Sequence, residues 1–264
     1  MDWSRAKTIL IWAFLFLNLF LYYQVLASRS DEWTDVEAVQ GGNWDVGLYL
    51  KQQQIELQGE IPQETPEMTY VNVEFNGLNL LALQEMKGVK LSIDQQTATI
   101  DATLVPPVAL DNQTEAHEVA RLLGQRLIHG TQYRYDATLS KRGQIRYWQL
   151  HDQYPIFNAP LDIYVENGHV TGYRQSYFHI RSQGSGRQVI SAHTALRSLV
   201  EREIVQPGEK IEAITLGYFG YHYDADIQVL APVWRVVHNG KVDYINGFTG
   251  AAERPLEMRT QPGS

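Results

Sequence analysis

The chain has 264 residues, of which 44% are apolar and 20% charged, and its formal net charge is -8. This usage is typical of globular rather than disordered proteins, and the acidic balance argues against nucleic acid as a partner. The absence of cysteine excludes disulfides, thiolate metal sites and thiol nucleophiles.

The first predicted element is a transmembrane helix over residues 8–27, which carry no formal charge. At about 1.5 Å per residue, a helix of this length matches a hydrocarbon core of about 30 Å. Arg5 and Lys7 precede the run and acidic residues follow it, so we expect residues 1–7 in the cytoplasm and the rest outside the cell membrane. A cleaved signal peptide is the alternative, because residues 25–27 resemble a cleavage site, but the run is longer than signal peptides usually have.

Asn18 lies near the middle of this predicted span, where no water can satisfy its amide. Hydrogen bonds between transmembrane helices contribute about 0.6–2 kcal/mol, so such an amide favours a partner helix. The alternative is that a single amide is tolerated without one. At helical spacing, the face predicted to dock another membrane protein consists of Ile11, Phe14, Leu15, Asn18, Leu21 and Tyr22.

The start of the chain, MDWSRAKTI at residues 1–9, runs directly into the apolar segment and resembles the start of the YycI (WalI) family. The resemblance implies a non-enzymatic accessory protein of the WalK/WalR two-component system, anchored by one helix. It also implies association with the sensor histidine kinase WalK and with the anchored protein YycH, and an effect on cell-wall gene expression. The family offers no catalytic motif and no cofactor to carry over to this chain.

Residues 28–43 are predicted to form a juxtamembrane linker, and residues 44–107 an N-terminal αβ unit. In that unit a short helix precedes a strand in which Val71 and Val73 alternate with polar residues. A hairpin is predicted after it, with its two strands on either side of residues 94–97. Pro106 and Pro107 are expected to end the unit.

One pattern then occurs twice, in a first lobe over residues 108–185 and a second over residues 186–254, and a disordered tail is expected over residues 255–264. Each lobe opens with an amphipathic helix, and each contains a hairpin with an Asn-Gly turn, at Asn167-Gly168 and Asn239-Gly240. The predicted fold class is α+β, with two similar helix-plus-antiparallel-sheet lobes that resemble PepSY, cystatin and YycH-like modules. The predicted apolar stripes are Ala116, Val119, Ala120, Leu123 and Leu127 in the first helix, and Ala192, Ala195, Leu196, Leu199 and Val200 in the second.

No catalytic, cofactor or metal site is predicted. The stretch HYDAD at residues 222–226 is more simply a polar turn than a set of metal ligands, and SQGSGRQ at 182–188 lacks the lysine of a phosphate loop. His117 and His193 hold equivalent helix positions, which indicates a solvated face.

The tyrosines offer a candidate contact surface on the ectodomain, and core packing is the competing interpretation of the same residues. The predicted function is a membrane-anchored extracytoplasmic regulator that binds a WalK-like sensor histidine kinase together with a YycH-like partner. The alternatives are a tethered envelope peptidase inhibitor or enzyme on a PepSY-like scaffold, and a scaffold without a signalling role. The predicted ectodomain contact residues are Tyr177, Tyr218, Tyr221 and Tyr223.

Overall fold

The structure is a computed structural model that describes residues 7, 10–24, 46–74, 86–94, 99–111, 113–221 and 227–253, without the side chains of residues 182 and 183. The chain divides into two compact units, Met1–Asp45 and Val46–Ser264, and each is described by itself. The predicted linker and the predicted C-terminal tail lie outside the described residues.

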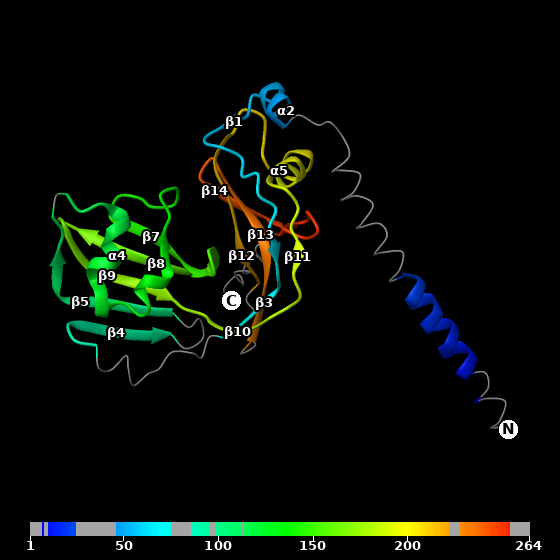
Figure 1. Cartoon of the computed structure of the whole chain (residues 1–264), viewed down its shortest axis with the longest axis horizontal. Helices are drawn as coiled ribbons and strands as arrows, with labels where there is room; N and C mark the ends of the chain where they lie inside the picture. The colour runs from blue at the N-terminus through cyan, green and yellow to red at the C-terminus, as the bar shows by residue number, and fades with distance from the viewer. Residues whose placement is uncertain are drawn as a thin grey trace, which may run out of the picture. The chain divides into compact units, whose positions relative to one another are not determined.

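In the first unit, residues 10–24 form a continuous helix, drawn at the blue end of the colour scale in Figure 1. The helix lies within residues 8–27, the run predicted to cross a membrane. Its large apolar side chains, from Leu10 to Tyr23, are exposed. Within the described part of the chain, no helix is both long enough and apolar enough to span a membrane.

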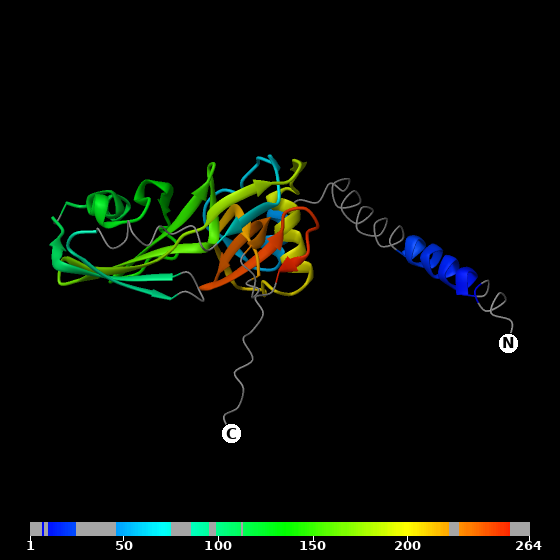
Figure 2. The same cartoon turned by 90° about the horizontal axis from the view of Figure 1, so that it is seen from below.

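The first lobe of the second unit is an antiparallel sheet with strand order β4-β5-β9-β8-β7-β6. A short helical region that includes α4 covers one face of this sheet (Figures 1 and 2). Leu104, Tyr147 and Leu161 are among the buried residues of its core. The strands are β4 (Val89–Asp94), β5 (Thr99–Ala109), β6 (Tyr133–Tyr135), β7 (Gln144–His151), β8 (Tyr154–Glu166) and β9 (His169–Ser176), and the helical segments are η1 (Ala116–Glu118), α4 (Val119–Leu123), η2 (Gly124–Arg126) and η3 (Gly130–Gln132).

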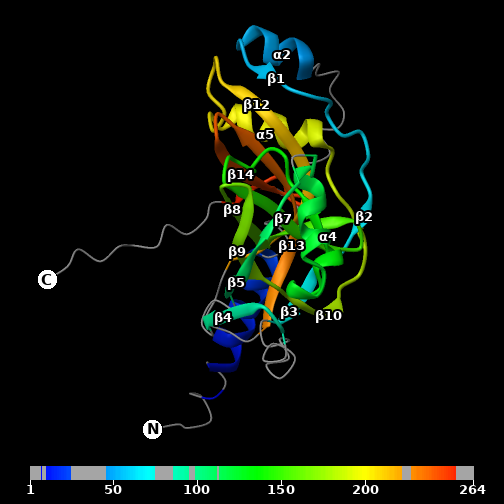
Figure 3. The same cartoon turned by 90° about the vertical axis from the view of Figure 1, so that its left-hand side faces the viewer.

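The second lobe is built on β12, β13 and β14, with α5 against β13 and β14. The strand β13 is long enough to pair with β12 and β14 at one end and with β3 at the other, and Figure 3 shows β3 between β13 and β10. The elements are α2 (Val46–Gln52), β1 (Glu56–Leu57), β2 (Glu67–Met68), β3 (Val71–Glu74), β10 (His179–Gln183), β11 (Arg187–Gln188), α5 (Ala192–Glu201), β12 (Lys210–Phe219), β13 (Ile227–His238), β14 (Lys241–Asn246) and β15 (Ala252–Glu253).

The predicted α+β class is therefore confirmed, and the two lobes share one continuous sheet. A parallel bridge between Tyr218 of β12 and Ile156 of β8 joins their strands. The two-stranded sheet of β2 and β11 stands apart from it. The two lobes also share a hydrophobic cluster that contains Trp148 and Phe157 of the first lobe and Val233 and Tyr244 of the second.

The residues expected to form the N-terminal unit, 44–107, are shared between the two lobes. β1 pairs with β12 and β3 pairs with β13, whereas β5 pairs with β9 of the first lobe. The alternation in β3 is confirmed, because Val71 and Val73 are buried and their neighbours are only partly buried. The predicted hairpin is confirmed by the pairing of β4 with β5, from Val89 opposite Leu104 to Asp94 opposite Thr99.

The expectation that Pro106 and Pro107 end this segment is wrong, because β5 continues to Ala109. The pairing of β5 with β9 shifts register between Thr103 and Val108. Proline lacks the N–H that a regular ladder needs, and an irregularity in the ladder is one of the places where a strand tolerates it. The prolines therefore interrupt the ladder without ending the strand.

The two predicted helices differ in continuity. In the second lobe α5 is a single helix, and its predicted apolar residues are all buried. In the first lobe the predicted helix is divided into η1, α4 and η2, and Gly124 has a positive φ of 51°. Val119, Ala120, Leu123 and Leu127 are buried as predicted, whereas Ala116 is only partly buried.

Both Asn-Gly hairpins are confirmed. Asn167 and Gly168 have φ values of 51° and 75°, and Asn239 and Gly240 have φ values of 45° and 72°. Two consecutive residues with positive φ define a type I′ turn, whose twist matches that of the flanking strands. The residues on either side of each turn pair with one another, Glu166 with His169 and His238 with Lys241.

Candidate functional site

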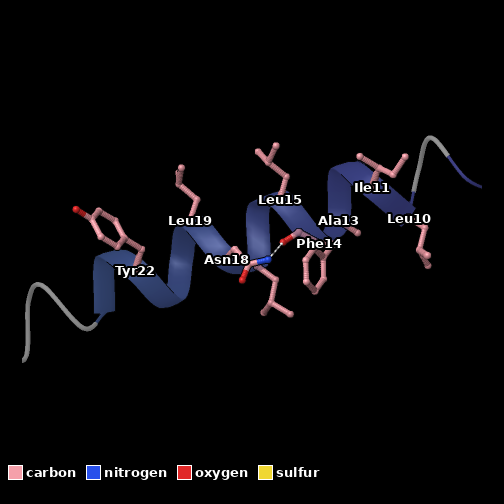
Figure 4. Close-up of a pocket in the computed structure, with 9 residues that line it drawn as sticks. Leu10, Ile11, Ala13, Phe14, Leu15, Asn18, Leu19 and Tyr22 are labelled. Atoms are coloured by element: carbon pink, nitrogen blue, oxygen red, sulfur yellow. Dashed lines mark hydrogen bonds between the residues drawn. The ribbon is translucent and has the colours of Figure 1, made fainter.

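The helical face predicted to bind a partner is exposed along residues 10–24. Asn18 donates a hydrogen bond from its amide nitrogen to the carbonyl oxygen of Phe14, at 2.9 Å, on the same helix (Figure 4). Within the described residues this is the one hydrogen bond of that side chain, so its carbonyl oxygen is still available as an acceptor. The side chains of Ile11, Phe14, Leu15, Leu21 and Tyr22 are between 47% and 67% exposed.

A shallow apolar hollow runs along this face, and Asn18 is the polar residue within it. Five of the six predicted contact residues line the hollow, and Leu21 does not. The helix thus presents apolar side chains around a single amide, an arrangement that another helix could cover while satisfying the amide. The lining is Leu10, Ile11, Ala13, Phe14, Leu15, Leu17, Asn18, Leu19 and Tyr22.

Of the four tyrosines predicted as an ectodomain contact surface, the structure describes three, and one of these, Tyr218, is buried. Tyr218 is only 4% exposed and packs beside His151, because its strand β12 lies in the interior of the sheet. Tyr177 donates a hydrogen bond to Gln132 at 3.0 Å and packs on the first-lobe core. Tyr221 contacts the ring of Phe219 edge-on, and Tyr223 lies outside the described residues.

The junction between the lobes contains a buried ion pair that the sequence analysis did not identify. Asp136, which follows β6, accepts a hydrogen bond from Arg235 of β13 at 2.5 Å, although the two residues are 99 positions apart. Both side chains are about 5% exposed. The same carboxylate oxygen accepts a hydrogen bond from the indole of Trp148, and the other oxygen accepts the backbone N–H groups of Thr138 and Leu139.

Aromatic side chains from both lobes surround this ion pair. The guanidinium of Arg235 lies 4.6 Å from the ring centre of Phe157 and 5.6 Å from that of Trp148, which permits cation–π attraction. Trp148 and Phe157 of the first lobe share a hydrophobic cluster with Val233 and Tyr244 of the second lobe. The cluster removes water from around the two charges, so their attraction is strong and the loss of either one is costly.

The ion pair shifts the pKa of its carboxyl group. Burial alone would raise the pKa of Asp136, but the charge of Arg235 and the hydrogen bonds from Trp148, Arg235 and the backbone outweigh burial and lower it. Asp136 is therefore ionised at neutral pH. Arg235 retains one unpaired group, because its buried Nε has no hydrogen-bond partner.

A second buried charged group lies in the second lobe at the end of β13. The imidazole of His238 is fully buried, and its two ring nitrogens lie 2.8 Å from carboxylate oxygens of Glu209 and Asp243. The hydrogen bond to Asp243 is the main reason why the pKa of His238 is raised; burial opposes the rise and Glu209 adds to it. Lys241 lies 3.3 Å from the other oxygen of Glu209.

Neither group has the arrangement of a catalytic centre. Every ring nitrogen and carboxylate described above is engaged in holding strands together, so none is directed at an open site. Among the residues that the structure describes, no group of three or more histidine, aspartate or glutamate side chains could hold a metal ion. The stretch at residues 222–226 lies outside that description, and His117 is exposed beside Glu115.

Local sequence gives only a weak signal for these charged groups. Asp136 and Thr138 have the spacing of an Asx turn, in which an aspartate accepts the N–H of the residue two positions on, and that turn is predictable. Its pairing with Arg235 is not predictable from the same stretch, because nothing near residue 136 specifies a strand 99 positions away.

The geometry thus defines a mixed α+β protein with an exposed apolar helix in one unit and a two-lobed body in the other. A sequence profile described as YycI protein matches residues 35–248. The chain therefore belongs to the YycI family, a family of regulatory accessory proteins associated with the WalK/WalR two-component system. Residues 1–9, which carry the resemblance noted from the sequence, lie outside the matched range.

Three solved structures are similar to the chain. An uncharacterized protein from Eubacterium rectale has 10% identity and a TM-score of 0.46, over 76% of this chain and 91% of that one. YycH from Bacillus subtilis has 13% identity and a TM-score of 0.41, over 68% and 50%. The C-terminal domain of YpeB from Bacillus megaterium has 12% identity and a TM-score of 0.35, over 67% and 96%. With TM-scores below 0.5, these likenesses support no functional conclusion, and a search of curated proteins found no match.

Proposed function

We propose that this protein is a membrane-anchored extracytoplasmic regulator that associates with a WalK-like sensor histidine kinase and a YycH-like partner. Through this association it modulates the two-component signalling that controls cell-wall metabolism. The observation that carries the proposal is the family match over residues 35–248, because it covers most of the two-lobed body. In this proposal residues 8–27 cross the membrane once, with the N-terminus in the cytoplasm.

The exposed helical face supports the membrane part of the proposal. It combines large apolar side chains with the amide of Asn18, whose carbonyl oxygen accepts no hydrogen bond within the described residues. In a lipid environment, a donor from a neighbouring helix would satisfy this oxygen. We infer that the face carrying Ile11, Phe14 and Asn18 docks against a transmembrane helix of the kinase or of the YycH-like protein.

A regulator of this kind can shift a kinase only through a difference in affinity for its two signalling states. A body held rigidly by buried charges at its junction would suit this role, because it presents the same surface to the partner each time. The direction of the effect depends on which of the two signalling states the complex favours.

The test compares three full-length variants in cells: replacement of residues 8–27 by an unrelated transmembrane helix, Asn18→Leu, and Phe20→Leu as a matched control. Phe20 is two positions from Asn18 and therefore faces elsewhere on the helix. We expect the helix replacement and Asn18→Leu to reduce co-purification of the kinase and to change transcription of wall-hydrolase genes. The control should do neither.

Unchanged co-purification and unchanged transcription after replacement of the whole helix would refute docking within the membrane. Deletion of the gene provides the broader test, since expression of wall-hydrolase genes must then shift. If deletion leaves their expression unchanged, the regulatory proposal itself is refuted.

A further inference from the structure

A small pocket lies where the two lobes meet the segment that connects β1 with β2, and its volume is about 270 Å³. Arg134 of β6 and Tyr154 of β8 line one side, and residues 214–216 of β12 line another. Pockets for drug-sized ligands have volumes of about 300–1,000 Å³. The pocket is therefore suited to a smaller group, of the size of one or two amino acid residues.

Arg134 lines the pocket with a guanidinium group that makes no ion pair there. Within the described residues its guanidinium has no hydrogen bond and no ion pair. The neighbouring carboxylate, Asp136, has both oxygens occupied, by Arg235 and Trp148 on one and by two backbone N–H groups on the other. Two guanidinium groups thus lie near one carboxylate at the junction, and that carboxylate is paired with Arg235 alone. The carboxylate that lines the pocket, Glu64, makes no ion pair with Arg134, so the guanidinium of Arg134 is left unpaired among the described residues.

The pKa of Arg134 reflects the absence of a paired carboxylate among the residues that the structure describes. Partial burial lowers the pKa of Arg134 and the nearby charge of Arg235 lowers it further, whereas Asp136 opposes them only in part. A bound anion would relieve this repulsion. Because guanidinium presents two parallel N–H groups, the anion it holds best is a carboxylate or a phosphate that accepts both.

A second charged residue of the lining favours a carboxylate with a single charge over a phosphate. Glu64 lines the same pocket, and it has no ion pair within the described part of the chain. Glu64 repels a dianion more strongly than a monoanion. The one unpaired guanidinium, that of Arg134, can neutralise a single negative charge but not two. The pocket therefore favours a singly charged carboxylate over a doubly charged phosphate.

The rest of the lining suits a short peptide end. The apolar residues of the lining, which offer cover for an aliphatic side chain, are Pro62, Pro66, Ile214, Leu216 and Trp234. Gln153 and Thr215 offer an amide and a hydroxyl to a peptide group. We propose that this pocket binds the C-terminal carboxylate of a peptide with an apolar last residue, with Arg134 as the residue that holds the carboxylate. The proposed site is independent of the helix docking argued above.

The probe is the dipeptide N-acetyl-Gly-Leu, titrated into the full-length protein in detergent micelles and followed by isothermal titration calorimetry. The same dipeptide with an amidated C-terminus should bind at least about tenfold more weakly, because it has no charge for Arg134. This comparison uses the unaltered protein, so it does not depend on whether any variant folds. Equal binding of the acid and the amide would overturn the proposal.

The variants are Arg134→Gln and, as a control with the same loss of charge on an exposed arginine outside the pocket, Arg142→Gln. Arg134→Gln should weaken binding of the free acid about tenfold and abolish its preference over the amide, with an unchanged melting temperature. Arg142→Gln should bind as the unaltered protein does. If both variants bind alike, Arg134 does not hold the carboxylate.

Two further arms define the ligand. Glu64→Gln should tighten binding about twofold, since it removes a like charge from the pocket. 4-Methylpentanoate has the carboxylate and the aliphatic end but no peptide group, and we expect it to bind more weakly than the dipeptide. Binding of equal strength would exclude a peptide end as the preferred ligand.

Discussion

The two lobes start from the same sequence pattern, an amphipathic helix followed by strands and an Asn-Gly hairpin, yet they stabilise it differently. In the second lobe Ser191 caps a continuous α5, and the side chain of Ser191 accepts the N–H of Thr194. In the first lobe Glu115 at the equivalent place makes no side-chain cap, and the helix is interrupted at Gly124. The comparison shows that burial of an apolar stripe is enough to place a helix, whereas its caps and glycines decide its length.

The lobes also differ in their buried charges. The second lobe contains the His238 group within its own strands, whereas the first lobe supplies Asp136 to an ion pair that is completed only by Arg235 of the second lobe. The first lobe thus depends on its neighbour for the neutralisation of a buried charge. Four substitutions test these two differences between the lobes, in their helices and in their buried charges, from the largest expected effect to the smallest.

Asp136→Ala should have the largest effect, because it leaves Arg235 buried without a counter-charge. Breaking a buried ion pair by removing one partner costs about 3–5 kcal/mol in the free energy of unfolding. Chemical denaturation of the full-length protein in micelles measures it. A matched control is Asp101→Ala, since Asp101 pairs with Arg174 in solvent, and exposed pairs contribute only about 0–1 kcal/mol. Similar losses in the two variants would refute the junction as a centre of stability.

His238→Gln should destabilise the protein by about 1–3 kcal/mol near pH 6, because the buried Glu209 and the partly buried Asp243 lose their charged partner. The effect depends on pH with a definite sign. The pKa of His238 is raised above its ordinary value of 6.5, so its stabilisation is complete below that value and is lost as the pH rises through the higher pKa of the folded state. The difference in stability between the unaltered protein and the variant should therefore shrink with rising pH, and a constant difference would contradict the arrangement.

Gly124→Ala should cost about 1–2 kcal/mol, because Gly124 has φ of 51° and ψ of -121°, a combination that residues with a side chain rarely adopt. A Cβ atom at this position meets no atom within 4 Å, so the cost is one of backbone strain alone. Thermal unfolding measures the loss. An unchanged melting temperature would mean that the break in the first helix is not fixed by this glycine.

Ser191→Ala should have the smallest effect, about 1 kcal/mol, from the loss of its cap on α5. The matched variant in the first lobe, Glu115→Ala, should change stability by less, because Glu115 makes no cap hydrogen bond. Denaturation midpoints of the two variants, measured side by side, check the contrast. If Glu115→Ala is the more damaging of the two, the lobes do not differ in capping as described.

Much of the local structure follows from short stretches of sequence. The alternation of Val71 and Val73 determined a strand with one buried face, and the two Asn-Gly pairs determined type I′ turns, because few other residues accept consecutive positive φ values. The apolar stripes of both helices were readable for the same reason, since burial imposes a helical period. Residues 8–27 were likewise readable as an apolar run with one amide at its centre.

Pairing at long range was decided only by the tertiary structure. Nothing local to residues 44–107 indicates that β3 joins β13 while β5 joins β9, and the same holds for Asp136 and Arg235. The burial of Tyr218, which removes this residue from the predicted contact surface, depends on the position of β12 inside the sheet. The period of apolar residues indicates which face of a helix or strand is buried, but it does not indicate which other element covers that face. The pocket at Arg134 therefore appears only once both lobes are assembled.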